Sequence, residues 1–203
     1  MWSIDLQTRR EELMLQLADD PALAKSLGNG VIAEASLSPS MTQVVVDVVA
    51  PPHANRRIFV SPANGLAPRA VSDPLLWVGY PAWSPDETQI AVELKDGSST
   101  HAATLDAKTG ALRRLTSEGG QTWVRSWSPD GKKIAAAVFR EGRWHLRWID
   151  AGSGAMGVIT AATAANTYMR YPEWSPRGDL IVYERGELRG NVWMLRLGKR
   201  APG

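Results

Sequence analysis

Six residues in the second half of the chain, Gly152-Ser153-Gly154-Ala155-Met156-Gly157, match the G-x-G-x-x-G pattern of dinucleotide-binding loops. In such a loop the glycines open a helix, and the N-terminus of that helix holds the pyrophosphate. The residues that follow here, Val158-Ile159-Thr160, instead occupy the place of a strand in a sequence repeat that is described below. The glycines are therefore predicted to form a hairpin, and no cofactor is expected.

Residue types that catalyse reactions or bind metals are few and scattered. The three histidines, His53, His101 and His145, fall in or beside connecting turns and third strands of different repeats, and no G-x-S-x-G nucleophile motif is present. Cysteine is absent, which removes thiolate metal ligands. Asp86 and Asp130 each bring a single carboxylate to a turn, whereas a calcium loop needs several oxygen ligands. Neither a catalytic residue nor a metal site is predicted.

A nine-residue phrase recurs through the chain and sets its organisation. It reads Trp83–Ala91, Trp127–Ala135 and Trp174–Val182, with a weaker copy at Leu37–Val45. The serines of the four copies, at positions 38, 84, 128 and 175, are 46, 44 and 47 residues apart. A fixed period of this size is the signature of a repeat architecture.

Each repeat has the same plan of short strands separated by Gly, Pro, Asp and Asn. Four strands in 44–47 residues predict an all-β protein, a β-propeller whose blades are four-stranded antiparallel sheets. At the corner after the first strand, proline ends the strand, Asp-Gly turns the chain and tryptophan fills the space between sheets. The corner residues to which we assign this structural role are Trp83, Ser84, Pro85, Asp86, Trp127, Ser128, Pro129, Asp130, Gly131, Trp174, Ser175 and Pro176.

The first 30 residues do not carry the phrase. Residues 1–7 alternate apolar and polar side chains, which predicts a strand. The segment 8–27 has two readings: Thr8 and Glu11 have the spacing of a capping box at the start of a helix, whereas Leu13, Leu15 and Leu17 keep a two-residue period. A strand near 11–17 is favoured. Residues 1–30 are thus predicted to be the end of a preceding blade plus a connecting loop.

Composition and charge exclude two classes of partner. The net charge is +2, and no run of Lys or Arg is longer than two, so no nucleic-acid-binding face is predicted. No stretch approaches 18 apolar residues, so no membrane span is predicted. Met1–Leu6 carries Asp5 and lacks the apolar region of a signal peptide.

The blades resemble those of the TolB-type WD40-like β-propeller repeat family. The resemblance is best over residues 83–116, which contain Trp-Ser-Pro-Asp, a third strand ending in Asp106, then Thr109-Gly110 and Arg114-Leu115-Thr116. It extends over about residues 30–197. Similar blades occur in TolB, in the propellers of prolyl-oligopeptidase-like hydrolases and in sensor fusions, so the resemblance implies a fold more narrowly than a function.

Four blades are predicted, at about residues 31–74, 75–118, 119–165 and 166–203. The last lacks a fourth strand in its own sequence. A four-bladed ring is one reading, and a segment of a propeller with six to eight blades is favoured, since propellers close with four to eight blades. As a segment, the protein would expose blade edges and apolar faces, which predicts self-association.

Polar residues on the first strand of each blade are the predicted binding site, because first strands line the central channel of a propeller. Mixed charge and two tyrosines suit a peptide or protein segment better than a phosphate-rich ligand. Arg125 has no charged counterpart in the other blades. Tyr80 and Tyr171 have packing between blades as an alternative role. The candidate residues are Glu34, Tyr80, Arg125, Arg170, Tyr171 and Glu173.

The predicted function is that of a non-catalytic scaffold that binds a protein or peptide partner. The resemblance to TolB implies a part of a larger bacterial envelope protein in the periplasm, and a cytoplasmic location is the alternative. A second interpretation is the gating propeller of a prolyl-oligopeptidase-like serine hydrolase whose catalytic domain lies outside these residues. A third is a sensor region fused to a kinase or a DNA-binding domain.

Overall fold

Sixteen strands and no helix make up the described part of the chain, which in the computed structural model comprises residues 2–4, 7–13, 30–50, 55–63, 68–160 and 164–187. The strands form five antiparallel sheets, three of them four-stranded. The predicted all-β class is therefore confirmed. Across these residues, nothing forms a helix long and apolar enough to cross a membrane.

The three four-stranded sheets follow one another in the sequence, and each connects its strands in simple order. The first contains β3 (Val31–Leu37), β4 (Gln43–Ala50), β5 (Asn55–Pro62) and β6 (Arg69–Ala70). The second contains β7 (Trp77–Trp83), β8 (Gln89–Asp96), β9 (Ser99–Asp106) and β10 (Leu112–Arg114). The third contains β11 (Gln121–Trp127), β12 (Lys133–Arg140), β13 (Arg143–Asp150) and β14 (Met156–Thr160). We call them blades 1, 2 and 3.

Two shorter sheets lie at the two ends of the series. Blade 4 is described as β15 (Thr167–Trp174) paired with β16 (Ile181–Glu187), and the third strand predicted at 191–197 lies outside the described residues. At the other end β1 (Trp2–Ile4) pairs with β2 (Glu11–Leu13). The strand favoured near 11–17 is confirmed over Glu11–Leu13, and the alternative of a helix is wrong there.

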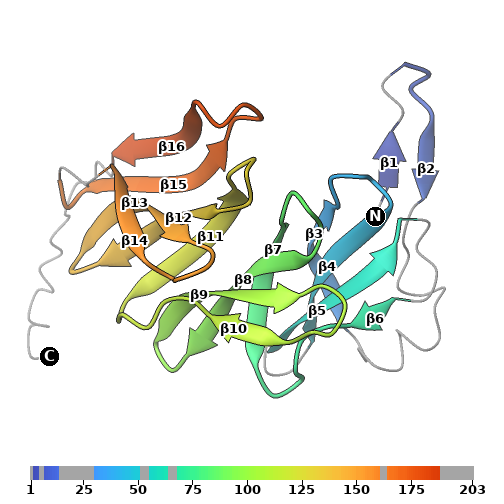
Figure 1. Cartoon of the computed structure of the whole chain (residues 1–203), viewed down its shortest axis with the longest axis horizontal. Coiled ribbons are helices and arrows are strands. Elements are labelled where there is room, and N and C mark those ends of the chain that lie inside the picture. Colours follow the sequence, from blue (N-terminus) through green and yellow to red (C-terminus); the bar gives the residue numbers. More distant parts are fainter. Residues whose placement is uncertain are drawn as a thin grey trace, which may run out of the picture.

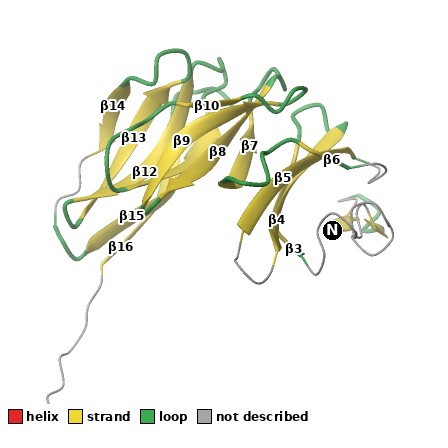
Figure 2. Cartoon of the chain, turned by 90° about the horizontal axis from the view of Figure 1, so that it is seen from below, coloured by secondary structure: helices red, strands yellow, loops and turns green. Residues whose placement is uncertain are grey.

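The blades stand face to face in an arc, with β3, β7, β11 and β15 on its inner side (Figures 1 and 2). Apolar side chains fill the space between consecutive blades. Val45 of blade 1 packs with Trp83 and Val92 of blade 2, and Ala91 of blade 2 packs with Trp127 of blade 3. The predicted role of the corner tryptophans is confirmed for these two blades, and each ring also donates from Nε1 to a first-strand carbonyl of the preceding blade.

The Ser-Pro-Asp corner is held by its own side chains. Ser128 Oγ accepts from Lys133 N at 2.9 Å and donates to Asp130 Oδ1 at 2.6 Å. Ser84 and Asp86 repeat this arrangement in blade 2. These hydrogen bonds lower the pKa of both aspartates below its ordinary value. Asp86 and Asp130 therefore act as the turn-capping residues that the sequence predicts.

The glycine-rich segment at 152–157 is a hairpin between β13 and β14, as predicted. Gly154 has φ +78°, and a Cβ placed on it would overlap the carbonyl oxygen of Leu115 in blade 2. Gly110 stands in the same position of blade 2, with φ +75°, against the carbonyl of Val71 in blade 1. Each of these glycines allows one blade to lie close against the one before it.

Candidate functional site

The inner strands share an irregularity that directs side chains into the channel. Each first strand slips in register against its second strand, between Ile32 and Glu34 in blade 1 and between Val124 and Ser126 in blade 3. The same slip in blades 2 and 4 leaves Tyr80 and Tyr171 unpaired, with φ of 55° and 52°. A β-bulge of this kind re-aims the bulged side chain. Tyr80 and Tyr171, each followed by a proline in the sequence, are thus bulge residues.

Aromatic and cationic side chains alternate across the channel surface, from blade to blade. The guanidinium carbon of Arg56 lies 5.4 Å from the ring centre of Trp77 and 4.1 Å from that of Tyr80. The guanidinium carbon of Arg125 lies 5.5 Å from the same Tyr80 ring and 4.6 Å from the ring of Tyr171. Cation–π contacts of this length are favourable. This ladder links blades 1 to 4.

Carboxylates hold the two arginines of the ladder in place. Asp47 is fully buried and forms an ion pair with Arg56, which also donates to the Tyr80 hydroxyl at 3.1 Å. Arg125 Nη1 lies 3.3 Å from Glu34 Oε1, which joins blade 3 to blade 1 across the channel. Burial raises the pKa of Asp47 and Glu34 above their ordinary values, and the neighbouring arginines oppose that rise.

One position of the second strand distinguishes blade 3 from the others. The residue ten places after the corner residue is Asp47, Glu93, Ala137 and Glu184 in blades 1 to 4. Asp47 has Arg56 as its partner, and Glu184 accepts from the Tyr168 hydroxyl at 3.2 Å. Blade 3 carries only a methyl group there, which leaves room beside its first strand.

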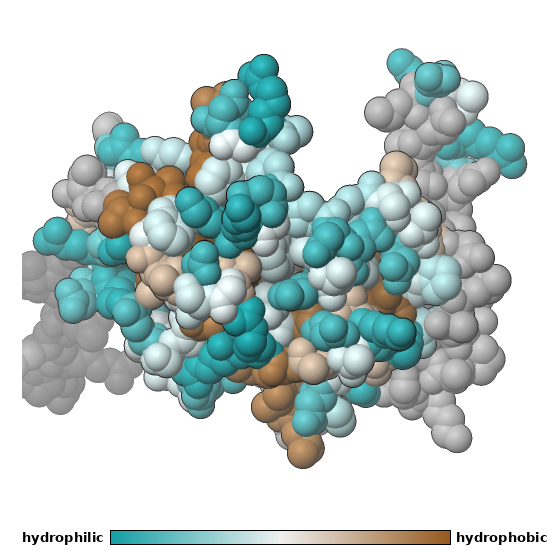
Figure 3. All heavy atoms as spheres, in the orientation of Figure 1, coloured by the Kyte–Doolittle hydropathy of each residue, from teal (hydrophilic) through white to brown (hydrophobic). Residues whose placement is uncertain are grey.

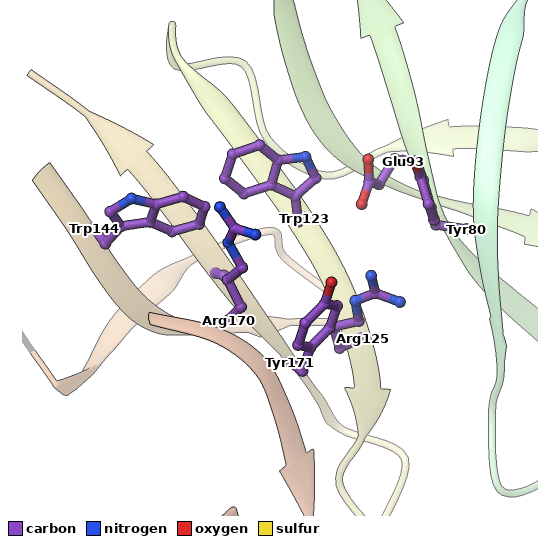
Figure 4. Close-up of a pocket in the computed structure, with 8 residues that line it drawn as sticks. Tyr80, Glu93, Trp123, Arg125, Trp144, Arg170 and Tyr171 are labelled. Atoms are coloured by element: carbon purple, nitrogen blue, oxygen red, sulfur yellow. The ribbon is translucent and has the colours of Figure 1, made fainter. Parts of the chain in front are cut away.

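A cavity of about 310 Å³ occupies this room. Its wall includes Trp123 and Trp144, which stack with ring centres 4.6 Å apart, and the guanidinium of Arg170 lies 5.1 Å from the Trp144 ring. Figure 4 shows Arg170, Arg125 and the Tyr171 ring reaching toward the same space as these rings. We call it the channel pocket. It is lined by Tyr80, Glu93, Trp123, Arg125, Ala137, Trp144, Arg170 and Tyr171.

Burial in the protein changes the charge state of one residue that lines the pocket, Glu93. Its side chain is buried, and Oε1 has no hydrogen-bond partner among the residues that the structure describes. Burial raises the pKa of Glu93 to about 9, although Arg125 and Arg56 lower it. At neutral pH this carboxyl group is therefore protonated, and the pocket keeps the positive charges of Arg125 and Arg170.

The sequence-predicted site residues divide into two groups. Tyr80, Arg125, Arg170 and Tyr171 line the channel pocket. Glu34 and Glu173 instead line, with Arg125, a wider groove of about 670 Å³ beside the proline corners. Tyr80 is half-buried under Arg56, as a packing residue would be, whereas Tyr171 is 51% exposed.

Glu93, Trp123 and Trp144 were not among the predicted site residues. Glu93 and Trp144 lie on second and third strands, which only the bulge and the alanine at 137 expose to the channel. Comparison of the repeats would have singled out the position of Glu93, because it is acidic in blades 1, 2 and 4 within otherwise apolar second strands and is alanine in blade 3.

The two histidines in the described part of the chain do not line this pocket. His101 is on β9 and His145 on β13, burial lowers the pKa of both, and His53 lies outside the described residues. Within the described ranges, no group of three or more His, Asp or Glu side chains is placed to hold a metal ion.

Repeated four-stranded blades around a channel lined by first strands define a β-propeller protein. A family model described as the TolB β-propeller domain matches residues 28–198, and the chain belongs to that family. This confirms the resemblance noted in the sequence. No match was found among curated protein sequences.

Solved structures with the same fold include proteins of different function. TolB from Acinetobacter baumannii is 17% identical and superposes with a TM-score of 0.67, over 90% of this chain and 42% of that one. An oligogalacturonate lyase from Vibrio parahaemolyticus is 13% identical and superposes with a TM-score of 0.67, over 89% of this chain and 51% of the lyase. A prolyl endopeptidase is 15% identical and superposes with a TM-score of 0.57, over 82% of this chain and 29% of the endopeptidase. This chain thus spans about half or less of each protein, and the likeness concerns the fold.

Proposed function

We propose that the protein is a non-catalytic scaffold that binds a protein or peptide segment at the mouth of its propeller channel. The observation that carries this proposal is the channel pocket, where aromatic and guanidinium side chains from three blades meet around about 310 Å³. Tyr, Trp and Arg are the residue types that dominate binding energy at protein interfaces. Cation–π contacts of Arg125 with Tyr80 and Tyr171, and of Arg170 with Trp144, hold these side chains in place before a partner binds, so less side-chain entropy is lost on binding.

Peptides selected from a random library for binding to the protein should lose at least about tenfold in affinity on Arg170→Ala and on Tyr171→Ala. Both side chains are exposed, so the melting temperature should stay close to that of the wild type. Calorimetric titration measures the first effect and differential scanning calorimetry the second. Arg177→Ala is the control, because Arg177 lies on an exposed corner turn outside the pocket. Equal binding by all three variants would exclude the channel pocket as the site.

Self-association is proposed for the β15–β16 end of the molecule. Val182 on β16 is 69% exposed, while its counterparts Val45 and Ala91 are buried against the next blade. Figure 3 shows apolar surface in this region. A second copy would cover it. Sedimentation velocity should show a dimer that weakens on Val182→Glu, and a concentration-independent monomer would contradict the proposal.

The alternative function is a gating propeller for a hydrolase domain on the same polypeptide, which the likeness to a prolyl endopeptidase favours. We propose a location in the bacterial periplasm, which the family relationship supports, with the cytoplasm as the alternative. The intact mass and N-terminal sequence of the native product distinguish these readings. A signal peptide favours the envelope scaffold, and a downstream domain bearing G-x-S-x-G favours the hydrolase.

A further inference from the structure

The channel pocket is lined by a carboxyl group, that of Glu93. Glu93 is 1% exposed, and its Oε1 accepts no hydrogen bond from any of the described residues. The equivalent acidic residues of blades 1 and 4 each have a side-chain partner: Asp47 pairs with Arg56 through Oδ2, although its Oδ1 is also buried without a partner, and Glu184 accepts from Tyr168. Glu93 has no such side-chain partner among the described residues, and it lines the channel pocket. Since a buried polar group without a partner is costly, we take this carboxyl group to mark a place where a ligand completes the hydrogen bonds.

Two guanidinium groups face the same space. Arg170 lies over the rings of Trp144 and Tyr168 and forms no ion pair within the described part of the chain. Arg125 forms one ion pair among the described residues, with Glu34 at 3.3 Å, and it lines the pocket, where Figure 4 shows it next to Tyr171. A guanidinium group has five N–H donors in a planar fork that matches a carboxylate.

The three polar groups are all hydrogen-bond donors at neutral pH. Each arginine donates through its N–H groups, and a protonated carboxyl group such as Glu93 donates through its O–H. The complementary ligand group therefore has only acceptors and carries negative charge. A carboxylate meets both conditions.

The walls of the pocket specify what lies beside that carboxylate. Trp123 and Trp144 present stacked indole rings, Tyr171 lies opposite, and Ala137 leaves the floor open. Flat aromatic walls favour a flat aromatic partner. A volume of about 310 Å³ is suited to a single residue rather than to a folded surface.

We propose that the channel pocket binds the C-terminal carboxylate of a peptide whose last residue is aromatic, with Arg125, Arg170 and Glu93 donating to the carboxylate. The aromatic side chain packs on Trp144 and Tyr171. The proposal rests on the peptide-binding function proposed above and specifies the end of the peptide and the residue type that the pocket takes.

The test is calorimetric titration of the whole chain at pH 7 with acetyl-Ala-Ala-Phe as the free acid and as the amide. The free acid should bind at least about tenfold more tightly than the amide, because the amide removes the charge and adds donors. Arg170→Met should abolish this preference. Glu93→Gln should keep it, because the amide nitrogen still donates, whereas Glu93→Leu should reduce it at an unchanged fold, judged by circular dichroism.

Three other outcomes overturn the inference. If acid and amide bind equally, the peptide-binding function stands but the carboxylate does not direct it. If phenylpropanoate binds as tightly as the peptide acid, the ligand is a free organic acid. If galacturonate binds and no peptide does, both the inference and the proposed function are wrong.

Discussion

Gly110→Ala should lower the free energy of unfolding by about 2–5 kcal/mol, from the cost of a left-handed backbone and that of overpacking. Gly110 has φ +75°, which disfavours any side chain, and its Cβ would overlap the Val71 carbonyl oxygen of blade 1. The atoms that the added Cβ would meet all belong to the backbone of Val71, so no flexible side chain can move aside to make room. The substitution should therefore separate blades 1 and 2, and urea unfolding measures the loss.

Gly97→Ala is the matched control. Gly97 also has a left-handed backbone, with φ +60°, but a Cβ there would meet no atom within 4 Å. Gly97→Ala should therefore lower the free energy of unfolding by only about 1–2 kcal/mol. Gly154→Ala, which faces Leu115 of blade 2 in the same way, should repeat the larger effect. Equal losses for Gly97→Ala and Gly110→Ala would show that blade contact at this glycine adds nothing to stability.

Glu93→Gln should stabilise the protein at pH 7, by up to about 3 kcal/mol, and the gain should grow from pH 5 to pH 9. Burial raises the pKa of Glu93 from 4.5 to about 9, so the folded state holds a proton that the unfolded state releases. Its stabilising contribution is complete below pH 4.5 and is lost progressively as the pH rises to about 9. Glutamine is neutral at every pH and removes this dependence.

Thermal unfolding of the wild type and the variant at several pH values measures this difference. The charged groups that act on Glu93 are Arg125, Arg56, Glu34 and Asp47, and they are common to both proteins. Glu184→Gln is the control, because Glu184 occupies the same position of blade 4 but is exposed. A stability difference for Glu93→Gln that does not change with pH would show that Glu93 is ionised in the folded protein.

Local signals in the repeat determined the strands and their corners. The order of strands, the Ser-Pro-Asp turns and the hairpin at Gly152–Gly157 depend on hydrogen bonds between residues close in sequence. The spacing of these signals is therefore enough to predict them. Four of the six candidate residues chosen from the sequence line the channel pocket, because the first strand of a blade faces the channel in every repeat.

What the repeat could not specify are the contacts between blades. Arg125 was singled out as a charge without a counterpart, but its pairing with Glu34, 91 residues earlier, depends on how blades 1 and 3 face each other. The pocket likewise exists because Ala137 has a small side chain. That space becomes a pocket only because Trp144 and Arg170, from two other strands, surround it. Burial of Glu93 depends on the same packing, and burial sets its charge state. Sequence alone determined the blades and their inner strands, whereas tertiary structure decided which side chains meet in the channel, because those contacts join residues that no local spacing relates.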